Sequence, residues 1–276
     1  MPANKRKSNQ ASRTHARLRD LSLIGMVHLP PLPGAPNARL PMADLIDRAV
    51  AEARVLARAG FDAIIVENFG DAPFAAERVP PETVAAMGVV VDHVVRAVKL
   101  PVGVNVLRND AAAALAVAAA TGASFIRVNI LCGAYATDQG IITGPAHDLL
   151  RLRARIAPRV MIAADVHVKH ATPISQPDIA LAAEETAYRG GADALIVSGS
   201  ATGSPTDFDA VRRVKDAVSD RPVWVGSGVT AERAMDYLDV ADAVIVGTCL
   251  KRGGKTTAAL DPKRAAAFVK VTRNRG

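Results

Sequence analysis

The chain has 276 residues, half of them hydrophobic but only 4% aromatic, which suits one domain of α/β type. Its net charge of +7 lies at the two ends: residues 1–19 carry +6 and residues 261–276 carry +4, which leaves −3 for residues 20–260. A nucleic-acid-binding surface across the whole domain is therefore not expected, and no run of 18 or more apolar residues predicts a membrane span.

Residues 1–20 are predicted to form a disordered basic tail, and residues 21–276 the folded domain. The tail has no apolar core of the kind found in a secretory signal. Residues 1–19 carry no acidic side chain, which also fits a contact with an acidic partner or an anionic membrane, or an organellar transit peptide. The two cysteines, Cys132 and Cys249, form no CxxC pattern and are expected to be reduced thiols in a cytoplasmic protein.

Short β-branched segments alternate with helical segments along the whole chain. The predicted strands are 21–29, 61–69, 101–107, 124–131, 159–168, 192–199, 222–226 and 241–247. The predicted helices are 44–59, 81–98, 110–121, 145–156, 178–189, 207–218, 231–238 and 262–271. Asp110 is expected near the start of its helix, and Gly60 and Gly122 follow helix ends as caps. A longer loop, 132–143, separates the fourth strand from its helix.

Eight such units predict a single closed (β/α)₈ barrel, the TIM-barrel fold. Three strands begin alike, with FDAIIV, ADALIV and ADAVIV, which is internal repetition of the βα unit. Their near-continuous Val, Ile and Leu residues are typical of parallel strands that are buried on both faces. The alternative is an open doubly wound sheet, which would normally carry a glycine fingerprint after the first strand; none is present there.

Polar residues recur at alternate positions near the carboxyl ends of several predicted strands. Because side chains alternate along a strand, Asp165, His167 and Lys169 share one face, and the apolar residues between them face the helices. Active sites of (β/α)₈ barrels lie at these strand ends. The inward-facing polar set is His28, Glu67, Asn105, Arg127, Asn129, Asp165, His167, Lys169 and Ser198.

Four of these side chains are the candidate catalytic residues: Glu67, Asp165, His167 and Lys169. The carboxylates and the imidazole suit general acid–base chemistry, and Lys169 suits an electrostatic clamp or an amine nucleophile. Alternatively, Asp165 and His167 ligate a divalent metal, with Glu67 or His28 added from neighbouring strands. A third interpretation is an ion-pair network that only fills the barrel. No cofactor follows from the sequence with certainty.

Glycine-rich segments follow the seventh and eighth strands. Gly226, Ser227 and Gly228 come after the seventh, and Gly247 and Thr248 after the eighth, followed by the basic run 251–255. Backbone N–H groups at such turns bind phosphate, and phosphate sites recur at this place in the fold. A small phosphorylated ligand is therefore predicted. The alternative is that these glycines only form the tight turns between strand and helix.

The predicted ligand-binding residues also include polar side chains around the rim. Two loops, 30–36 and 135–140, are expected to border the site as lids, and Asp138 lies in the second of them. The segment 202–206 after the sixth strand adds hydroxyl groups to the same rim. The complete predicted ligand-binding set is His28, Asn105, Arg127, Asn129, Asp138, Ser198, Gly226, Ser227, Gly228, Gly247 and Thr248.

Several long motifs resemble the BtpA/SgcQ family. They are IGMVHLPPLPGAP (24–36), VENFGDAPF (66–74), RVNILCGAYATDQGII (127–142), ADVHVKHA (164–171), LIVSGSATGSP (195–205) and WVGSGVT (224–230). The resemblance runs from about Leu21 to the last helix and implies a (β/α)₈ barrel. It also implies an association with photosystem I biogenesis for BtpA-type members and with sugar metabolism for SgcQ-type members.

Two functions follow as hypotheses. The first is an enzyme acting on a small phosphorylated sugar or nucleoside derivative, which the inward-facing polar set favours. The second is a non-catalytic biogenesis or stability factor for photosystem I or another membrane complex, with the basic ends as contacts. The sequence does not decide the oligomeric state, and a homo-oligomer is one of the alternatives.

Overall fold

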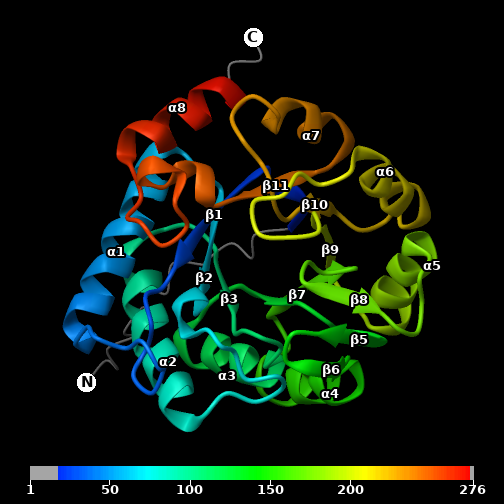
Figure 1. Ribbon diagram of the computed structural model, residues 1–276, viewed down its shortest axis with the longest axis horizontal. Helices are drawn as coiled ribbons and strands as arrows, with labels where there is room; N and C mark the ends of the chain where they lie inside the picture. The colour runs from blue at the N-terminus through cyan, green and yellow to red at the C-terminus, as the bar shows by residue number, and fades with distance from the viewer. Residues whose placement is uncertain (1–17, 274–276) are drawn as a thin grey trace, which may run out of the picture.

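The computed structural model describes residues 18–273 and confirms the predicted barrel (Figure 1). Eight parallel strands close in the order β1-β11-β10-β9-β7-β4-β3-β2, and helices surround them. The strands are β1 Leu23–His28, β2 Ala63–Glu67, β3 Val102–Asn105, β4 Phe125–Val128, β7 Met161–Val166, β9 Ala194–Val197, β10 Val223–Val225 and β11 Ala243–Val246. Each lies within a predicted strand.

The helices also follow the prediction. They are α1 Met42–Ala59, α2 Pro81–Ala97, α3 Ala111–Thr121, α4 Ala146–Ile156, α5 Ile179–Glu184, α6 Phe208–Ala217, α7 Ala234–Val240 and α8 Pro262–Arg273. The Asp110 carboxylate accepts the Ala113 N–H at 2.8 Å and caps α3. Gly60 ends α1 with a φ of 98°, a conformation that glycine adopts without steric cost. No helix within residues 18–273 is long and apolar enough to span a bilayer.

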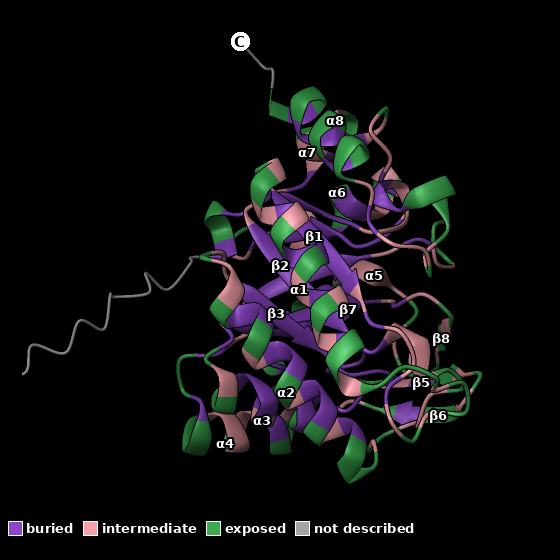
Figure 2. Ribbon diagram, turned by 90° about the vertical axis from the view of Figure 1, so that its left-hand side faces the viewer, coloured by how far each residue is buried: buried purple, intermediate pink, exposed green. Residues whose placement is uncertain are grey.

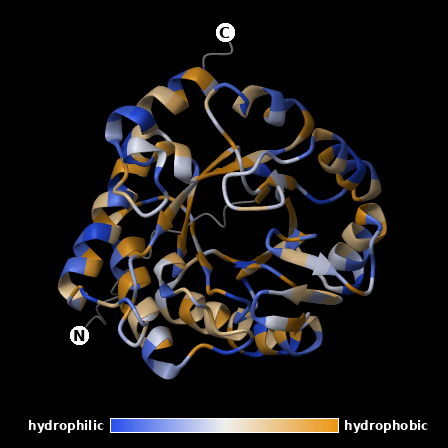
Figure 3. Ribbon diagram, viewed as in Figure 1, coloured by the Kyte–Doolittle hydropathy of each residue, from blue (hydrophilic) through white to orange (hydrophobic). Residues whose placement is uncertain are grey.

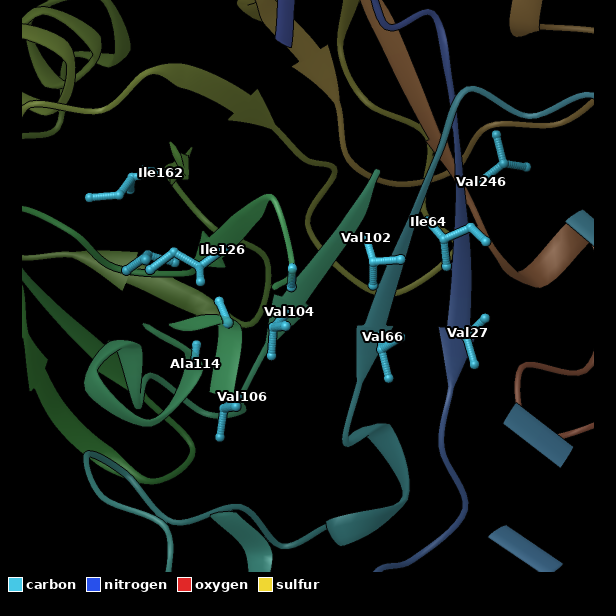
Figure 4. Close-up of a cluster of buried hydrophobic side chains, with 14 of the residues drawn as sticks. Val27, Ile64, Val66, Val102, Val104, Val106, Ala114, Ile126, Ile162 and Val246 are labelled. Carbon is cyan, nitrogen blue, oxygen red and sulfur yellow. The ribbon is translucent and has the colours of Figure 1, made fainter. Parts of the chain in front are cut away.

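Apolar residues form two separate layers. The outward strand residues, Val27, Val66 and Val104 among them, pack beneath the helices, where Figure 4 shows them on adjacent strands. The alternate residues, such as Ile65, Phe125 and Trp224, fill the barrel interior as a second cluster. The helices turn hydrophilic faces outward, whereas the strands are largely hydrophobic (Figure 3). Because side chains alternate along a strand, every second strand residue points its side chain toward the barrel axis.

Two expectations about loops and ends were wrong. The segment predicted as a loop over 132–143 contains a hairpin, β5 Ala134–Thr137 and β6 Gly140–Thr143, which pairs with β8 Ala171–Pro173. This small antiparallel sheet follows β4 and β7, so it stands at the carboxyl-end face of the barrel, at one side of the view in Figure 2. A hairpin of four-residue strands is too short to show a clear hydrophobic period in the sequence.

The predicted tail ends earlier than residue 20. Leu18–Asp20 form a short 3₁₀ helix, and Leu18, only 3% exposed, joins the interior cluster of the barrel beside Leu21. One leucine among basic residues gave no periodic signal, so this contact was missed. The rest of the predicted tail, residues 1–17, lies outside the described residues.

Candidate functional site

The sheet register aligns polar side chains across four neighbouring strands. His28 pairs with Glu67, Glu67 with Asn105, and Asn105 with Arg127. Parallel partners point to the same face, and their neighbours two residues back, Met26, Ile65 and Phe125, belong to the interior cluster. The four polar residues therefore form one row at the carboxyl end of the interior.

Arg127 and Asp165 form a buried, two-pronged ion pair. Arg127 Nε donates to Asp165 Oδ2 and Nη2 donates to Oδ1, both at 2.8 Å. Ser198 Oγ also donates to Oδ1 at 3.1 Å, and Asn129 Nδ2 lies 3.5 Å from Oδ2. Both carboxylate oxygens are thus occupied, so Asp165 holds the guanidinium in place and is poorly suited to act as a base or to ligate a metal.

Glu67 and His28 face each other without such partners. His28 Nε2 lies 3.7 Å from Glu67 Oε1, and the buried Nδ1 of His28 has no partner among residues 18–273. Burial raises the pKa of Glu67. Burial also lowers the pKa of His28 well below 6.5, and the positive charges of Lys251, Lys169 and Arg127 lower it further. At neutral pH the imidazole is therefore uncharged.

Lys169 and Arg108 bring two further cationic groups to this end of the barrel. Arg108 Nη2 donates to the Lys169 carbonyl oxygen at 2.6 Å, while its buried Nε has no partner in the described chain. Asn105 donates to Asn129 Oδ1 at 3.0 Å, but its own Oδ1 is buried and unpartnered. Arg108 was not predicted, because it follows β3 in a segment with no strand alternation to mark its direction. Buried polar atoms without partners are rare in folded proteins.

A cavity of about 460 Å³ opens at this face. Of the predicted site residues, it is lined by His28, Glu67, Arg127, Lys169, Gly226, Ser227, Gly228, Gly247 and Thr248. Lining residues that the sequence did not single out as site residues include Thr230, Glu232, Cys249, Arg264 and Phe268. Arg264 and Phe268 come from α8, which closes the barrel beside β1 and α1, a contact that only the tertiary structure creates. Burial raises the pKa of the Cys249 thiol to about 11, so it stays protonated at neutral pH.

The glycine segments bring backbone amides to the same cavity. The Gly226 N–H donates a hydrogen bond to Val197 O at 2.8 Å. The N–H groups of Ser227, Gly228, Gly247 and Thr248 have no acceptor within residues 18–273. Gly228 has a φ of 68°, and a Cβ there would lie 2.2 Å from Ser204 O. The loop backbone therefore approaches its neighbour more closely than any other residue type permits.

Several predicted residues lie elsewhere. His167 leaves the strand alternation with a φ of 52°, and its Nε2 lies 2.9 Å from Gln176 O, outside the cavity lining. Asp138 is exposed at the turn between β5 and β6. Asn105, Asn129, Asp165 and Ser198 are not among the cavity-lining residues. Within the described chain no three His, Cys, Asp or Glu side chains could hold a metal ion together, so the Asp165–His167 metal interpretation lacks a ligand set.

The basic run after β11 also differs from its expectation. Lys251 is fully buried, and its Nζ lies 2.6 Å from Glu52 Oε2, so it does not reach the glycine segments as a phosphate ligand. Arg252 and Lys255 are exposed. Of residues 251–255, the cavity lining includes Gly254 and no charged side chain.

Known proteins match the chain over nearly its whole length. A family model described as "BtpA family" matches residues 19–274. The chain is 47% identical to the photosystem I biogenesis protein BtpA of Synechocystis sp., over 90% of this chain and 87% of that protein. It is 46% identical to an uncharacterized protein of Pyrococcus abyssi, over 91% of this chain and 96% of that protein.

Solved structures show the same architecture. N-(5'-phosphoribosyl)anthranilate isomerase from Pyrococcus furiosus superposes with a TM-score of 0.56 at 15% identity, over 92% of this chain and 99% of that chain. A tryptophan synthase chain from M. tuberculosis gives a TM-score of 0.56 at 21% identity, over 93% and 95%. At such low identity the likeness extends to the fold alone.

Proposed function

The chain belongs to the BtpA family, and from this premise we propose that it is an enzyme acting on a small phosphorylated sugar or nucleoside-type substrate. One observation carries the proposal: a single cavity is lined both by ionisable side chains on the barrel axis and by backbone amides without acceptors. A scaffold protein needs neither of these features. Together they suit a ligand with an anionic group at one end and a reacting centre at the other.

The phosphate would lie against the amides of Ser227, Gly228, Gly247 and Thr248. Several N–H groups that converge on one cavity bind an anion through charge-assisted hydrogen bonds.

The reacting part of the substrate would lie over the axis, between Glu67 and Arg127. A buried carboxyl group whose pKa is raised keeps its proton to a higher pH than an exposed one, so Glu67 acts as the general acid or base. The uncharged His28 beside it can accept or pass on that proton. Arg127, held rigidly by Asp165, binds an oxygen atom of the substrate without reorganising.

A charge placed in the anion site tests the phosphate position. Thr248→Asp puts a carboxylate beside the proposed phosphate, so we expect binding of inorganic phosphate and of ribose 5-phosphate to weaken at least about tenfold, or roughly 1.4 kcal/mol. Thr257→Asp is the matched control, because Thr257 is exposed and does not line the cavity. Titration calorimetry measures both. The proposal fails if the unmodified chain binds neither ligand, or if both variants bind equally.

A second function is favoured by the name of one relative. The Synechocystis protein is a photosystem I biogenesis protein, which suggests that this chain assists assembly of a membrane complex. In that case a chain lacking residues 1–17 should lose its partners in a pull-down, since this segment carries much of the positive charge. The deletion stops before Leu18, which is buried in the barrel. The enzyme proposal instead expects the shortened chain to bind phosphate unchanged.

A further inference from the structure

Lys169 has an amine that the fold leaves unused. Its side chain is half-buried and lines the cavity, yet its Nζ donates no hydrogen bond and forms no ion pair within residues 18–273. Lys251 provides the contrast, because that buried amine lies 2.6 Å from Glu52 Oε2. A desolvated ammonium that forms no hydrogen bond and no ion pair is costly, so the arrangement at Lys169 favours the neutral amine.

The surroundings of Lys169 carry charges of both signs. Burial lowers the pKa of Lys169 most, the positive charges of Arg127 and Arg108 lower it further, and the carboxylates of Glu67 and Asp165 raise it. The net shift is downward. The backbone of Lys169 is held by the hydrogen bond from Arg108 Nη2 to the Lys169 carbonyl oxygen. A lysine that served only as a phosphate clamp would need its charge. Cationic groups are already supplied by the guanidinium of Arg127.

We propose that Lys169 is a covalent catalytic residue, whose amine forms an imine with the carbonyl group of an aldose or ketose phosphate. The inference rests on the proposed function, because it names the substrate class and the chemistry of the same cavity. Three features of the described structure carry it: an unpaired amine facing the cavity, the Glu67 carboxyl group on the same lining, and the backbone amides that would hold the phosphate.

The chemical step balances with groups that are present. The neutral Lys169 nitrogen attacks the carbonyl carbon, and the Glu67 carboxyl group protonates the carbonyl oxygen. Glu67 then takes one proton from the new ammonium, which leaves a carbinolamine and a protonated Glu67. Glu67 protonates the hydroxyl group, the C–O bond breaks, and water leaves as the nitrogen lone pair forms the C=N bond. The products are a protonated imine, one water molecule and the Glu67 carboxylate.

Reductive trapping tests this step on the full chain. The protein is incubated with D-glyceraldehyde 3-phosphate, reduced with sodium borohydride, and the modified lysines are mapped by peptide mass spectrometry. We expect Lys169 to be labelled at least about tenfold faster than Lys255, because its amine lines the cavity in which the substrate carbonyl is held and its lowered pKa enlarges the neutral fraction. Lys255 is an exposed lysine next to Gly254, which lines the cavity. Lys169→Arg should lose the label, and Lys255→Arg should keep it.

The outcomes separate this inference from the proposed function. If phosphate binds by calorimetry but Lys169 carries no reduced adduct, or no more than Lys255, the imine is overturned and the phosphate site stands. If Lys169 is labelled equally by glyceraldehyde and its phosphate ester while phosphate does not bind, the imine stands and the phosphate site fails. Labelling of Lys169 that requires the phosphate ester and is blocked by inorganic phosphate supports both.

Discussion

Two inward-facing carboxylates differ only in their neighbours. Asp165 is met by Arg127 and Ser198, so its charge is fully compensated and it serves to orient the guanidinium. Within residues 18–273 the Glu67 carboxylate accepts no hydrogen bond, and its ion-pair partner is His28 Nε2 at 3.7 Å. Burial raises its pKa, against the positive charges of Lys169 and Arg127, which lower it. Two carboxylates on the inward face thus become a fixed support in one case and a titratable group in the other.

The buried His28 predicts a pH dependence of stability. Its folded pKa lies well below 6.5, so below pH 6.5 the unfolded chain takes up a proton that the folded chain does not. This contribution is present above about pH 6.5 and is lost as the pH falls, by up to about 1.4 kcal/mol per pH unit. His28→Gln should flatten the fall in the free energy of unfolding between pH 6.5 and about pH 5, measured by urea titration.

His93→Gln is the control for this measurement. His93 lies exposed on α2, so the His93 variant should show the same slope of unfolding free energy against pH as the unmodified chain. An equal slope for the His28 variant and the unmodified chain would show that the imidazole titrates alike in both states.

At the scale of the elements, the interior packing explains the glycine within β3. Gly103 pairs in register with Phe125 on β4, and a Cβ at Gly103 would lie 2.3 Å from Phe125 Cε2. The Phe125 ring is held in turn by an edge-on contact with Trp224, with ring centroids 5.9 Å apart. The Phe125 ring on β4 therefore requires a residue without a side chain at the paired position of β3.

The contact predicts opposite effects for two glycine substitutions. Gly103→Ala should lower the free energy of unfolding by about 1–3 kcal/mol, because the ring cannot move aside in a packed interior. Gly88→Ala on α2 should raise it by about 0.5–1 kcal/mol, since nothing lies within 4 Å of the added Cβ and alanine favours the helix. Urea titration of both variants measures the two changes. Similar effects at the two positions would contradict this account of the interior.

For the whole molecule, closure of the barrel depends on contacts between its first and last units. β1 pairs with β11 and α1 packs against α8. Between these layers, Glu52 of α1 accepts Lys251 Nζ at 2.6 Å with one oxygen and Leu260 N–H at 3.1 Å with the other. The buried ion pair therefore joins segments about 200 residues apart.

Breaking this pair on one side should be costly. Lys251→Met leaves Glu52 as an uncompensated buried charge and is expected to lower the free energy of unfolding by about 3–5 kcal/mol. Adding Glu52→Gln removes that charge and keeps an acceptor for Leu260 N–H, so the double variant should recover most of the loss. A double-mutant cycle by urea denaturation measures the coupling, and additive losses would refute a paired role.

The order and type of the main elements were predictable from the sequence because they depend on local patterns. Runs of Val, Ile and Leu marked the eight strands, and residues such as Asp110 and Gly60 marked helix ends. The hairpin at β5 and β6 and the buried Leu18 were missed. Their partners, β8 and the barrel interior, are brought together only by the closed fold.

The sequence by itself determined the barrel and the inward face of its polar residues, because side-chain alternation is a property of one strand at a time. The tertiary structure alone decided how these residues divide. In the folded structure Asp165 pairs with Arg127, His167 lies outside the cavity lining, and Glu67 and Lys169 line the cavity. Lys251 is also buried against Glu52. The physical reason is that burial and charge compensation depend on side chains from neighbouring strands, whose register no single segment encodes.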